Sequence, residues 1–355
     1  MERHVLEMFK TVEYKNLIEN LKDYALIDVR SPKEHEEYTI PGAINIPLFT
    51  NEERKEIGTV YINESVEKAK KMGIEAVSKK LPQIFDDIME LHKKNRNLVF
   101  FCARGGMRSS SITALVNSLG ISAYKIKGGY KGYREFINDE MNTINSEIKY
   151  IVVHGKTGTG KTEILKKLHS KGYDMLDLEE CANHRGSLLG SVGLGECRKQ
   201  KMFESLVIEE LRKRKTNYVF IEGESKRIGN IILNNDIFDA MKNGYHIYVE
   251  SSLEERAELL IEEYTQHGSS KEEILSALDN MEKYLGKKKA AHYKELINND
   301  GFYEVALELM TDYYDPMYLN SMKGYEFEFK FYIENVDEGV SALEKWYKDN
   351  IGINI

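Results

Sequence analysis

The sequence predicts an α/β protein with two domains. A chain of 355 residues exceeds the roughly 250 to 300 residues at which single cores stop growing, so we expect two cores. Two apolar, strand-like runs each lead into a glycine-containing loop and then a helix, at 98–109 and at 150–162. The segment 138–149 between them is polar and lacks periodicity. We therefore expect one domain over residues 1–140 and a second over residues 148–355.

Composition limits the class of protein. Hydrophobic residues make up 41% of the chain and charged residues 30%, which is typical of a soluble globular protein. No apolar run approaches the roughly 20 residues that cross a bilayer, and MERHVLEMFK is unlike a signal peptide, so we expect a cytoplasmic protein with no membrane partner. A net charge of −8 argues against indiscriminate nucleic-acid binding. The three cysteines, Cys102, Cys181 and Cys197, are too few and too scattered for a disulfide framework or a zinc site.

The first domain is predicted to alternate strands and helices. Residues 24–29 have the composition of a buried strand, and Asp28 at its end is well placed to order the loop that follows. The polar stretch at about 50–97 has the apolar spacing of surface helices and is predicted to be an insertion.

The segment LVFFCARGGMRS at 98–109 is predicted to present a reactive cysteine. A strand delivers Cys102 into a turn that contains two glycines and two arginines, Arg104 and Arg108. Backbone N–H groups of such a turn, the arginines and the start of a helix near Ser109 would stabilise a thiolate or a tetrahedral oxyanion. The alternative is a buried structural cysteine, but arginines and glycines are poor material for a buried turn.

The second domain begins with a strand and a phosphate-binding loop. YIVVHGKTGTGKT contains the pattern G-x-x-x-x-G-K-T, with Gly155, Gly158, Gly160, Lys161 and Thr162 predicted to bind a phosphate or diphosphate. A second apolar strand ends at Glu222, so Thr162 and Glu222 are the candidate ligands for Mg²⁺. Because aspartate is usual at this position, the glutamate weakens any prediction of ATP hydrolysis, and the use of ATP stays open.

The stretch 173–195 supplies further candidates for the second site. Its polar residues and glycines suit a second anionic group or RNA, although a flexible connector is the alternative; the candidates are Asp177, Glu179, His184, Arg185 and Ser187. From residue 253 the pattern is mainly helical, and the tyrosines of DYYDPMY either pack a helix bundle or stack on unpaired bases.

Several of these motifs resemble known families. IDVRSPKEHEEYTIPGAINIP and FCARGGMRS resemble a rhodanese domain, over about residues 10–137. The Cys102–Arg108 spacing, C-x5-R, is longer than in many simple sulfurtransferases and favours a phosphate-sized ligand. The order of domains, with DLEECANHRGS, IEGESKRIG and YYDPMY, resembles the tRNA 2-selenouridine synthase family. This implies an N-terminal rhodanese-like domain followed by a P-loop NTPase-like α/β domain with a helical C-terminal region.

The resemblance also implies a chemistry. Members replace the sulfur of wobble 2-thiouridine in tRNA with selenium from selenophosphate, and transfer a geranyl group from geranyl diphosphate to that sulfur. We expect the P-loop to bind the diphosphate and the Cys102 loop to receive selenophosphate, with tRNA and a selenophosphate-supplying enzyme as partners. Two rival hypotheses are an ATP-dependent kinase fused to a sulfurtransferase acting on a small metabolite, and a non-catalytic anion-binding module.

Overall fold

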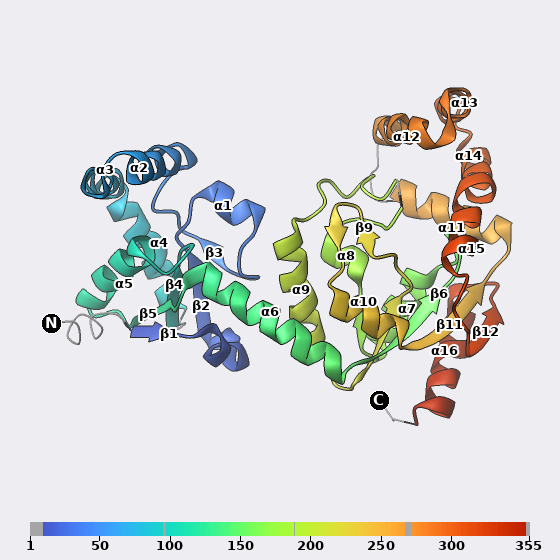
Figure 1. The fold of residues 1–355 in the computed structure, drawn as a ribbon, viewed down its shortest axis with the longest axis horizontal. Helices are drawn as coiled ribbons and strands as arrows, with labels where there is room; N and C mark the ends of the chain where they lie inside the picture. Colours follow the sequence, from blue (N-terminus) through green and yellow to red (C-terminus); the bar gives the residue numbers. More distant parts are fainter. Residues whose placement is uncertain (1–9, 95–96, 188, 267–270, 353–355) are drawn as a thin grey trace. The chain divides into compact units, whose positions relative to one another are not determined.

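The chain forms two compact units, residues 1–140 and residues 141–355, in the computed structural model (Figure 1). The structure describes residues 10–94, 97–187, 189–266 and 271–352. The N-terminal segment 1–9, which contributed to the prediction of a cytoplasmic protein, lies outside the described residues. No helix in the described ranges is long and apolar enough to cross a membrane.

The first unit is built on a five-stranded, fully parallel sheet. The strand order is β1 (Lys10–Val12), β5 (Ala123–Ile126), β4 (Asn97–Phe101), β2 (Tyr24–Asp28) and β3 (Ile44–Asn45). Strand β4 lies at the centre, and its last four residues are fully buried. Since parallel strands buried on both faces read as continuous apolar runs, LVFF forms this strand and delivers Cys102 to its carboxyl end.

Four α-helices come before β4 in the described part of this unit: α1 (Pro32–Glu37), α2 (Asn51–Asn63), α3 (Val66–Ser78) and α4 (Leu81–Lys93). The last three are the surface helices of the polar insertion. Helices α1 and α2 begin with capping boxes, in which Ser31 bonds reciprocally with Glu34, and Thr50 with Glu53. These caps fix where each helix starts and therefore which side chains face the neighbouring loop.

The segment 138–149 is not the non-periodic connector that the sequence suggested. Helix α6 (Gly129–Glu147) runs through most of it. Ile137, Met141 and Ile144 recur at helical spacing and are each at most 4% exposed. The polar residues between these three obscured the periodicity.

The second unit contains another five-stranded parallel sheet. Its order is β12 (Phe329–Tyr332), β11 (Tyr245–Glu250), β6 (Lys149–His154), β8 (Tyr218–Glu222) and β7 (Met175–Leu176). The predicted pair of strands that carry the P-loop and Glu222 are therefore neighbours, β6 and β8. Other elements of this unit are α7 (Lys161–Ser170), α8 (Leu178–Ala182), α9 (Gln200–Arg212), the hairpin β9 (Arg227–Ile228) and β10 (Ile231–Ile232), and α10 (Asn235–Lys242).

The C-terminal region is helical up to residue 321 and then returns to the sheet. Its helices are α11 (Leu253–Gln266), α12 (Lys271–Leu285), α13 (Lys287–Asn298), α14 (Phe302–Leu309), the π-helical turn η3 (Met310–Tyr314) and α15 (Asp315–Ser321). They bury a separate core that includes Leu278, Met281 and Tyr293. Strand β12 and helix α16 (Val336–Asn350) then complete the sheet and its cover, so the C-terminal end belongs to the P-loop core.

Candidate functional site

Cys102 lies where β4 ends, and its thiol faces the first turn of α5 (Met107–Ser118). The residue is 3% exposed, and Sγ lies 3.2 Å from the Oγ of Ser109. The first amide groups of an α-helix have no partner within the helix and carry a partial positive charge. The thiol therefore has a hydroxyl donor beside it and a helix N-terminus close by, as an anionic nucleophile requires.

The Cys102 loop packs closely against the backbone of a second glycine pair, Gly128 and Gly129. Gly129 has φ +60°, and a Cβ on it would lie 2.2 Å from the carbonyl oxygen of Cys102. The next residue, Tyr130, donates its N–H to that same oxygen at 2.8 Å. The backbone of the KGGYKG motif at 127–132 thus fixes the conformation of the cysteine loop. The sequence analysis did not assign this role to the motif.

The two arginines predicted to hold anions differ in the structure. Arg104 is exposed and has no hydrogen bond or ion pair within the described residues. Arg108 is bound to Glu34, with Nη1 2.7 Å from Oε2 and Nη2 3.3 Å from Oε1. Burial alone would raise the pKa of Glu34, but the hydrogen bond and charge of Arg108 outweigh it and lower that pKa. Arg108 must therefore leave a strong partner before it can hold a ligand.

Asp28 orders the base of this site through a buried ion pair. Arg30 Nη2 lies 2.6 Å from Asp28 Oδ2, and both side chains are at most 2% exposed. The Arg30 guanidinium also lies 4.6 Å from the ring centroid of Tyr130, the residue that bonds to the Cys102 carbonyl. The loop-ordering role predicted for Asp28 is confirmed.

The P-loop has the backbone that phosphate binding needs. Gly158 and Gly160 have φ values of +80° and +72°, and α7 begins directly after them. Lys161 is 9% exposed, and its Nζ lies 3.8 Å from Glu222 Oε2. Thr162 donates a hydrogen bond to Glu222 Oε1. The two predicted Mg²⁺ ligands therefore lie together, and a hydroxyl beside a carboxylate is an oxygen set that suits this hard cation.

The YYDPMY motif closes one wall of the P-loop. Asp315 accepts two hydrogen bonds from Arg256, which is 2% exposed and whose Nε donates to the carbonyl of Thr157 at 2.8 Å. A Cβ on Gly158 would lie 2.4 Å from the Arg256 carbonyl. Lys161 Nζ lies 5.9 Å from the ring centroid of Tyr318. The buried Arg256 side chain thus stabilises the P-loop conformation. The DYYDPMY motif contributes to the site as well as to the helical core.

Half-buried carboxylates also lie close to Lys161 of the P-loop. Burial, and then the charge of Glu222, raise the pKa of Glu224 to about 7 and that of Glu179 well above its usual value. Asp177 caps α8 by accepting from Glu180 N–H, and burial raises its pKa to about 6. The site therefore holds carboxyl groups that are able to exchange protons near neutral pH.

The remaining predicted candidates, Arg185, Ser187 and His184, are held by contacts within the second unit. Arg185 is 8% exposed; it donates to the Val192 carbonyl and lies 4.9 Å from the Tyr264 ring centroid. Ser187 bonds to the hydroxyl of the same tyrosine at 3.0 Å. A Cβ on Gly229 would lie 2.8 Å from a ring carbon of His184. These residues of the 173–195 stretch therefore make specific tertiary contacts. The guanidinium of Arg185 already binds groups of the protein itself.

A buried histidine pair below the P-loop escaped the sequence reasoning. His154, the last residue of β6, lies 2.9 Å from His246 of β11 between Nε2 and Nδ1. Burial, His246 and Lys161 lower the pKa of His154 to about 3. The only signal in the sequence was a polar residue at the end of an apolar strand.

Fold and sites together define a two-domain protein with a cysteine at the end of the central strand in one unit and a P-loop in the other. Residues 11–136 match the model of the rhodanese-like domain, and residues 148–348 match the model of the tRNA 2-selenouridine synthase AAA domain. The chain belongs to the tRNA 2-selenouridine synthase family.

Two curated relatives, each matched over most of its length, support this membership. A protein named tRNA 2-selenouridine synthase from Pseudomonas syringae pv. syringae (strain B728a) is 30% identical over 336 residues, which cover 84% of this chain and 88% of the relative. One of the same name from Nitrosomonas europaea is 29% identical over 350 residues, covering 85% and 90%. A crystal structure of the N-terminal domain of a putative ATP/GTP binding protein from Clostridium difficile 630 is 41% identical, with a TM-score of 0.34, and covers 36% of this chain and 98% of that one.

Proposed function

We propose that this protein is a selenotransferase that replaces the sulfur of wobble 2-thiouridine in tRNA with selenium. Selenophosphate is the selenium donor, and the reaction passes through an S-geranylated nucleoside made from geranyl diphosphate. The observation that carries this proposal is the presence of two separate anion sites in one chain, the Cys102 loop and the P-loop. Each anionic co-substrate then has a site of its own.

Prenyl transfer is assigned to the P-loop unit. The thiocarbonyl sulfur forms a bond to C1 of the geranyl group, the C1–O bond breaks and diphosphate leaves. Lys161 and the loop amides stabilise the departing oxygens. The N3 proton of the base must also leave, and Glu224, with its pKa raised to about 7, is suited to accept it. Thr162 and Glu222 would hold Mg²⁺, which offsets charge on the diphosphate.

Selenium transfer is assigned to the Cys102 loop. S-alkylation converts a poor sulfide leaving group into a thiolate of the prenyl chain, so the sulfur departs more easily. A selenium–C2 bond forms as the C2–S bond breaks, and water then cleaves the selenium–phosphorus bond to release phosphate. Arg104 is free to bind the selenophosphate oxygens, while Arg108 must exchange Glu34 for the ligand. Cys102 is placed to mediate delivery.

The two assignments are tested separately in purified protein with 2-thiouridine tRNA. Cys102→Ala is expected to abolish 2-selenouridine while the S-geranyl nucleoside still forms. Lys161→Ala is expected to lower diphosphate binding and prenyl transfer about 100-fold, the order of effect of losing a preorganised charged contact. Cys197→Ala, at a partly exposed free cysteine of the other unit, is the control and should keep both activities. Normal selenation by Cys102→Ala, or hydrolysis of ATP that does not respond to tRNA, would contradict the proposal.

A further inference from the structure

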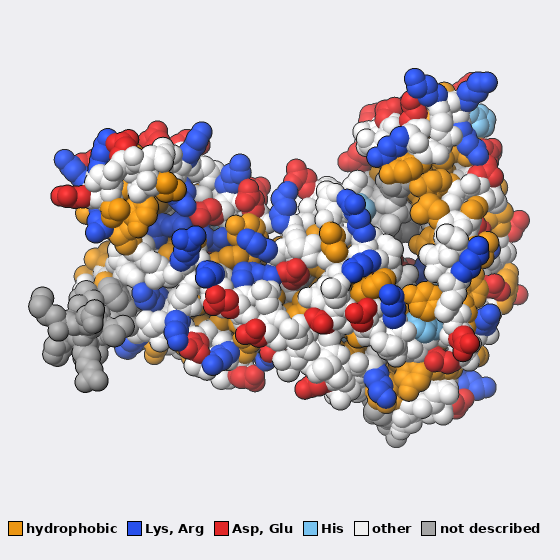
Figure 2. Space-filling model, viewed as in Figure 1, with side chains coloured by type: hydrophobic (Ala, Val, Ile, Leu, Met, Phe, Trp, Pro, Cys, Tyr) orange, Lys and Arg blue, Asp and Glu red, His pale blue; other side chains and the backbone are white. Residues whose placement is uncertain are grey.

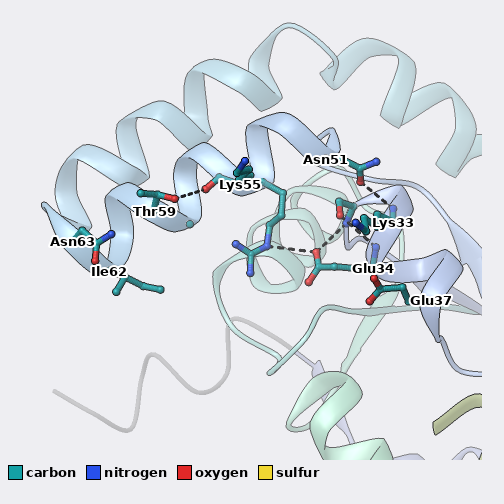
Figure 3. A pocket seen from close by; sticks show the side chains of 11 residues that line it. Lys33, Glu34, Glu37, Asn51, Lys55, Thr59, Ile62 and Asn63 are labelled. Carbon is teal, nitrogen blue, oxygen red and sulfur yellow. Dashed lines mark hydrogen bonds and ion pairs between the residues drawn. The ribbon is translucent and has the colours of Figure 1, made fainter. Parts of the chain in front are cut away.

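A groove of about 410 Å³ lies between α1 and α2 of the first unit (Figure 3). Its donors are Lys33, Asn51, Arg54, Lys55 and Asn63, while the Thr59 hydroxyl donates to the Lys55 carbonyl at 2.9 Å. Glu34 forms part of its wall and is the residue that binds Arg108, on the first turn after the cysteine loop. The groove therefore borders the Cys102 site through a direct contact.

The groove is locally positive in an acidic protein. Within the described part of the chain, the ammonium groups of Lys33 and Lys55 have no ion pair. Arg54 and Arg108 share the single carboxylate of Glu34, at 3.4 and 2.7 Å. One further carboxylate, Glu37, lies in the groove and offsets only part of this charge. Figure 2 shows Lys and Arg side chains gathered on the visible face of this unit, below α2 and beside α1.

Gly58 leaves space beside the guanidinium of Arg54. A Cβ on Gly58, one turn further along α2, would lie 2.4 Å from Arg54 Nη1. Because Gly58 has no side chain, the guanidinium can lie over this turn of α2, from where it reaches Glu34. Glycine in a helix interior costs about 1 kcal/mol relative to alanine, so the helix propensity of Gly58 is unfavourable at this position.

The other lining groups suit a polynucleotide better than a small anion. Asn51, Thr59 and Asn63 follow one another along α2 and present amide and hydroxyl groups. Ile62 beside them is 81% exposed, which is an apolar surface at the mouth of a charged groove. A chain of phosphates separated by hydroxyl-bearing sugars and flat bases matches this mixture of cations, neutral donors and apolar contact.

We propose that the groove between α1 and α2 binds the tRNA phosphodiester backbone beside the nucleotide that reacts at the Cys102 loop. The inference rests on the proposed function, since it takes tRNA as the substrate. Binding of phosphates by Lys33 and Lys55 anchors the strand, and Arg54 positions it relative to Glu34 and Arg108.

The test is the affinity for 2-thiouridine tRNA, measured as a function of salt for the full-length protein. Lys33→Ala/Lys55→Ala is expected to weaken binding roughly tenfold at 100 mM salt and to reduce the slope of log Kd against log salt by about 1.4. The matched control is Lys70→Ala/Lys71→Ala, which removes the same charge from exposed positions of α3 and should change neither quantity. Gly58→Ala keeps every charge and displaces only the end of the Arg54 side chain, so it is expected to weaken binding less than the loss of the two lysines.

The outcomes separate the groove from the function. Equal losses in the two lysine pairs, or unchanged affinity in Lys33→Ala/Lys55→Ala, would overturn the groove while leaving tRNA as the substrate. Displacement of tRNA by millimolar inorganic phosphate at constant ionic strength would assign the groove to a small anion and also overturn the inference. A wild-type protein that does not bind tRNA would instead contradict the proposed function.

Discussion

The guanidinium of Arg256 binds both carboxylate oxygens of Asp315, with Nη1 2.9 Å from Oδ2 and Nη2 2.5 Å from Oδ1. The arginine comes from α11 and the aspartate from the start of α15, and the arginine Nε also bonds to the P-loop. The helical C-terminal region is therefore attached to the phosphate-binding loop through Asp315, which also lies 3.5 Å from Nζ of the loop residue Lys156.

Removal of Asp315 should destabilise the second unit. Asp315→Ala leaves Arg256 buried without its partner, so we expect a loss of about 3 kcal/mol in the free energy of unfolding. Thermal or urea unfolding measures this. Asp312→Ala, three residues earlier, removes a carboxylate from the exposed pair with Lys289 and should cost less than about 1 kcal/mol. Similar losses in both variants would show that Asp315 does not act as a buried brace.

Gly129 should be indispensable for the shape of the cysteine loop. In Gly129→Ala the new Cβ would meet the Cys102 carbonyl at 2.2 Å, in addition to the strain of a φ of +60°. We expect a loss of roughly 3 kcal/mol in unfolding free energy and loss of selenation. Gly120→Ala has a similarly positive φ but open space around it, and should cost only about 1 kcal/mol. The difference between the two measures the clash alone.

Ser109 should increase the reactivity of Cys102. Its hydroxyl lies 3.2 Å from Sγ, within reach to donate to a thiolate, so Ser109→Ala is expected to slow alkylation of Cys102 by iodoacetamide about tenfold. Mass spectrometry of the modified peptide follows the rate at neutral pH. Ser111→Ala, on the exposed side of the same helix turn, is the control. A rate unaffected by the loss of the Ser109 hydroxyl would rule out this stabilisation.

Acid should weaken the second unit through His154. Its pKa is about 3 in the folded protein and 6.5 when unfolded, so the folded state takes up the proton less readily. The contribution of His154 is complete above pH 6.5 and falls by roughly 2 kcal/mol between pH 6.5 and pH 5. The raised pKa values of Glu224 and Asp177 act in the opposite direction. The measurement is therefore the difference in unfolding free energy between wild type and His154→Gln across this range; a constant difference would contradict the shift.

The strand, turn and helix around each predicted site could be predicted from the sequence because they depend on local order. A strand, a glycine-containing turn and a helix follow one another within 98–109 and within 150–162, so spacing alone located Cys102, Lys161 and Thr162. The proximity of Glu222 to Thr162 also followed, because carboxyl ends of neighbouring parallel strands lie at one edge.

Long-range contacts could not be predicted in the same way. The pairing of Arg108 with Glu34, and of Arg256 with Asp315, joins residues 74 and 59 positions apart. The role of Gly129 depends on a backbone that passes within van der Waals distance of the cysteine loop. Such relationships arise from tertiary packing, and periodicity and motif spacing carry no information about them.

The most direct test of the proposed function is nucleoside mass spectrometry of tRNA from cells grown with selenium. Cells that lack this protein should contain 2-thiouridine and no 2-selenouridine. The wild-type gene should restore 2-selenouridine, and the Cys102→Ala form should accumulate the S-geranyl nucleoside instead. Persistence of 2-selenouridine in cells without the protein, or its formation by Cys102→Ala at the wild-type level, would contradict the proposed selenium transfer at the Cys102 loop.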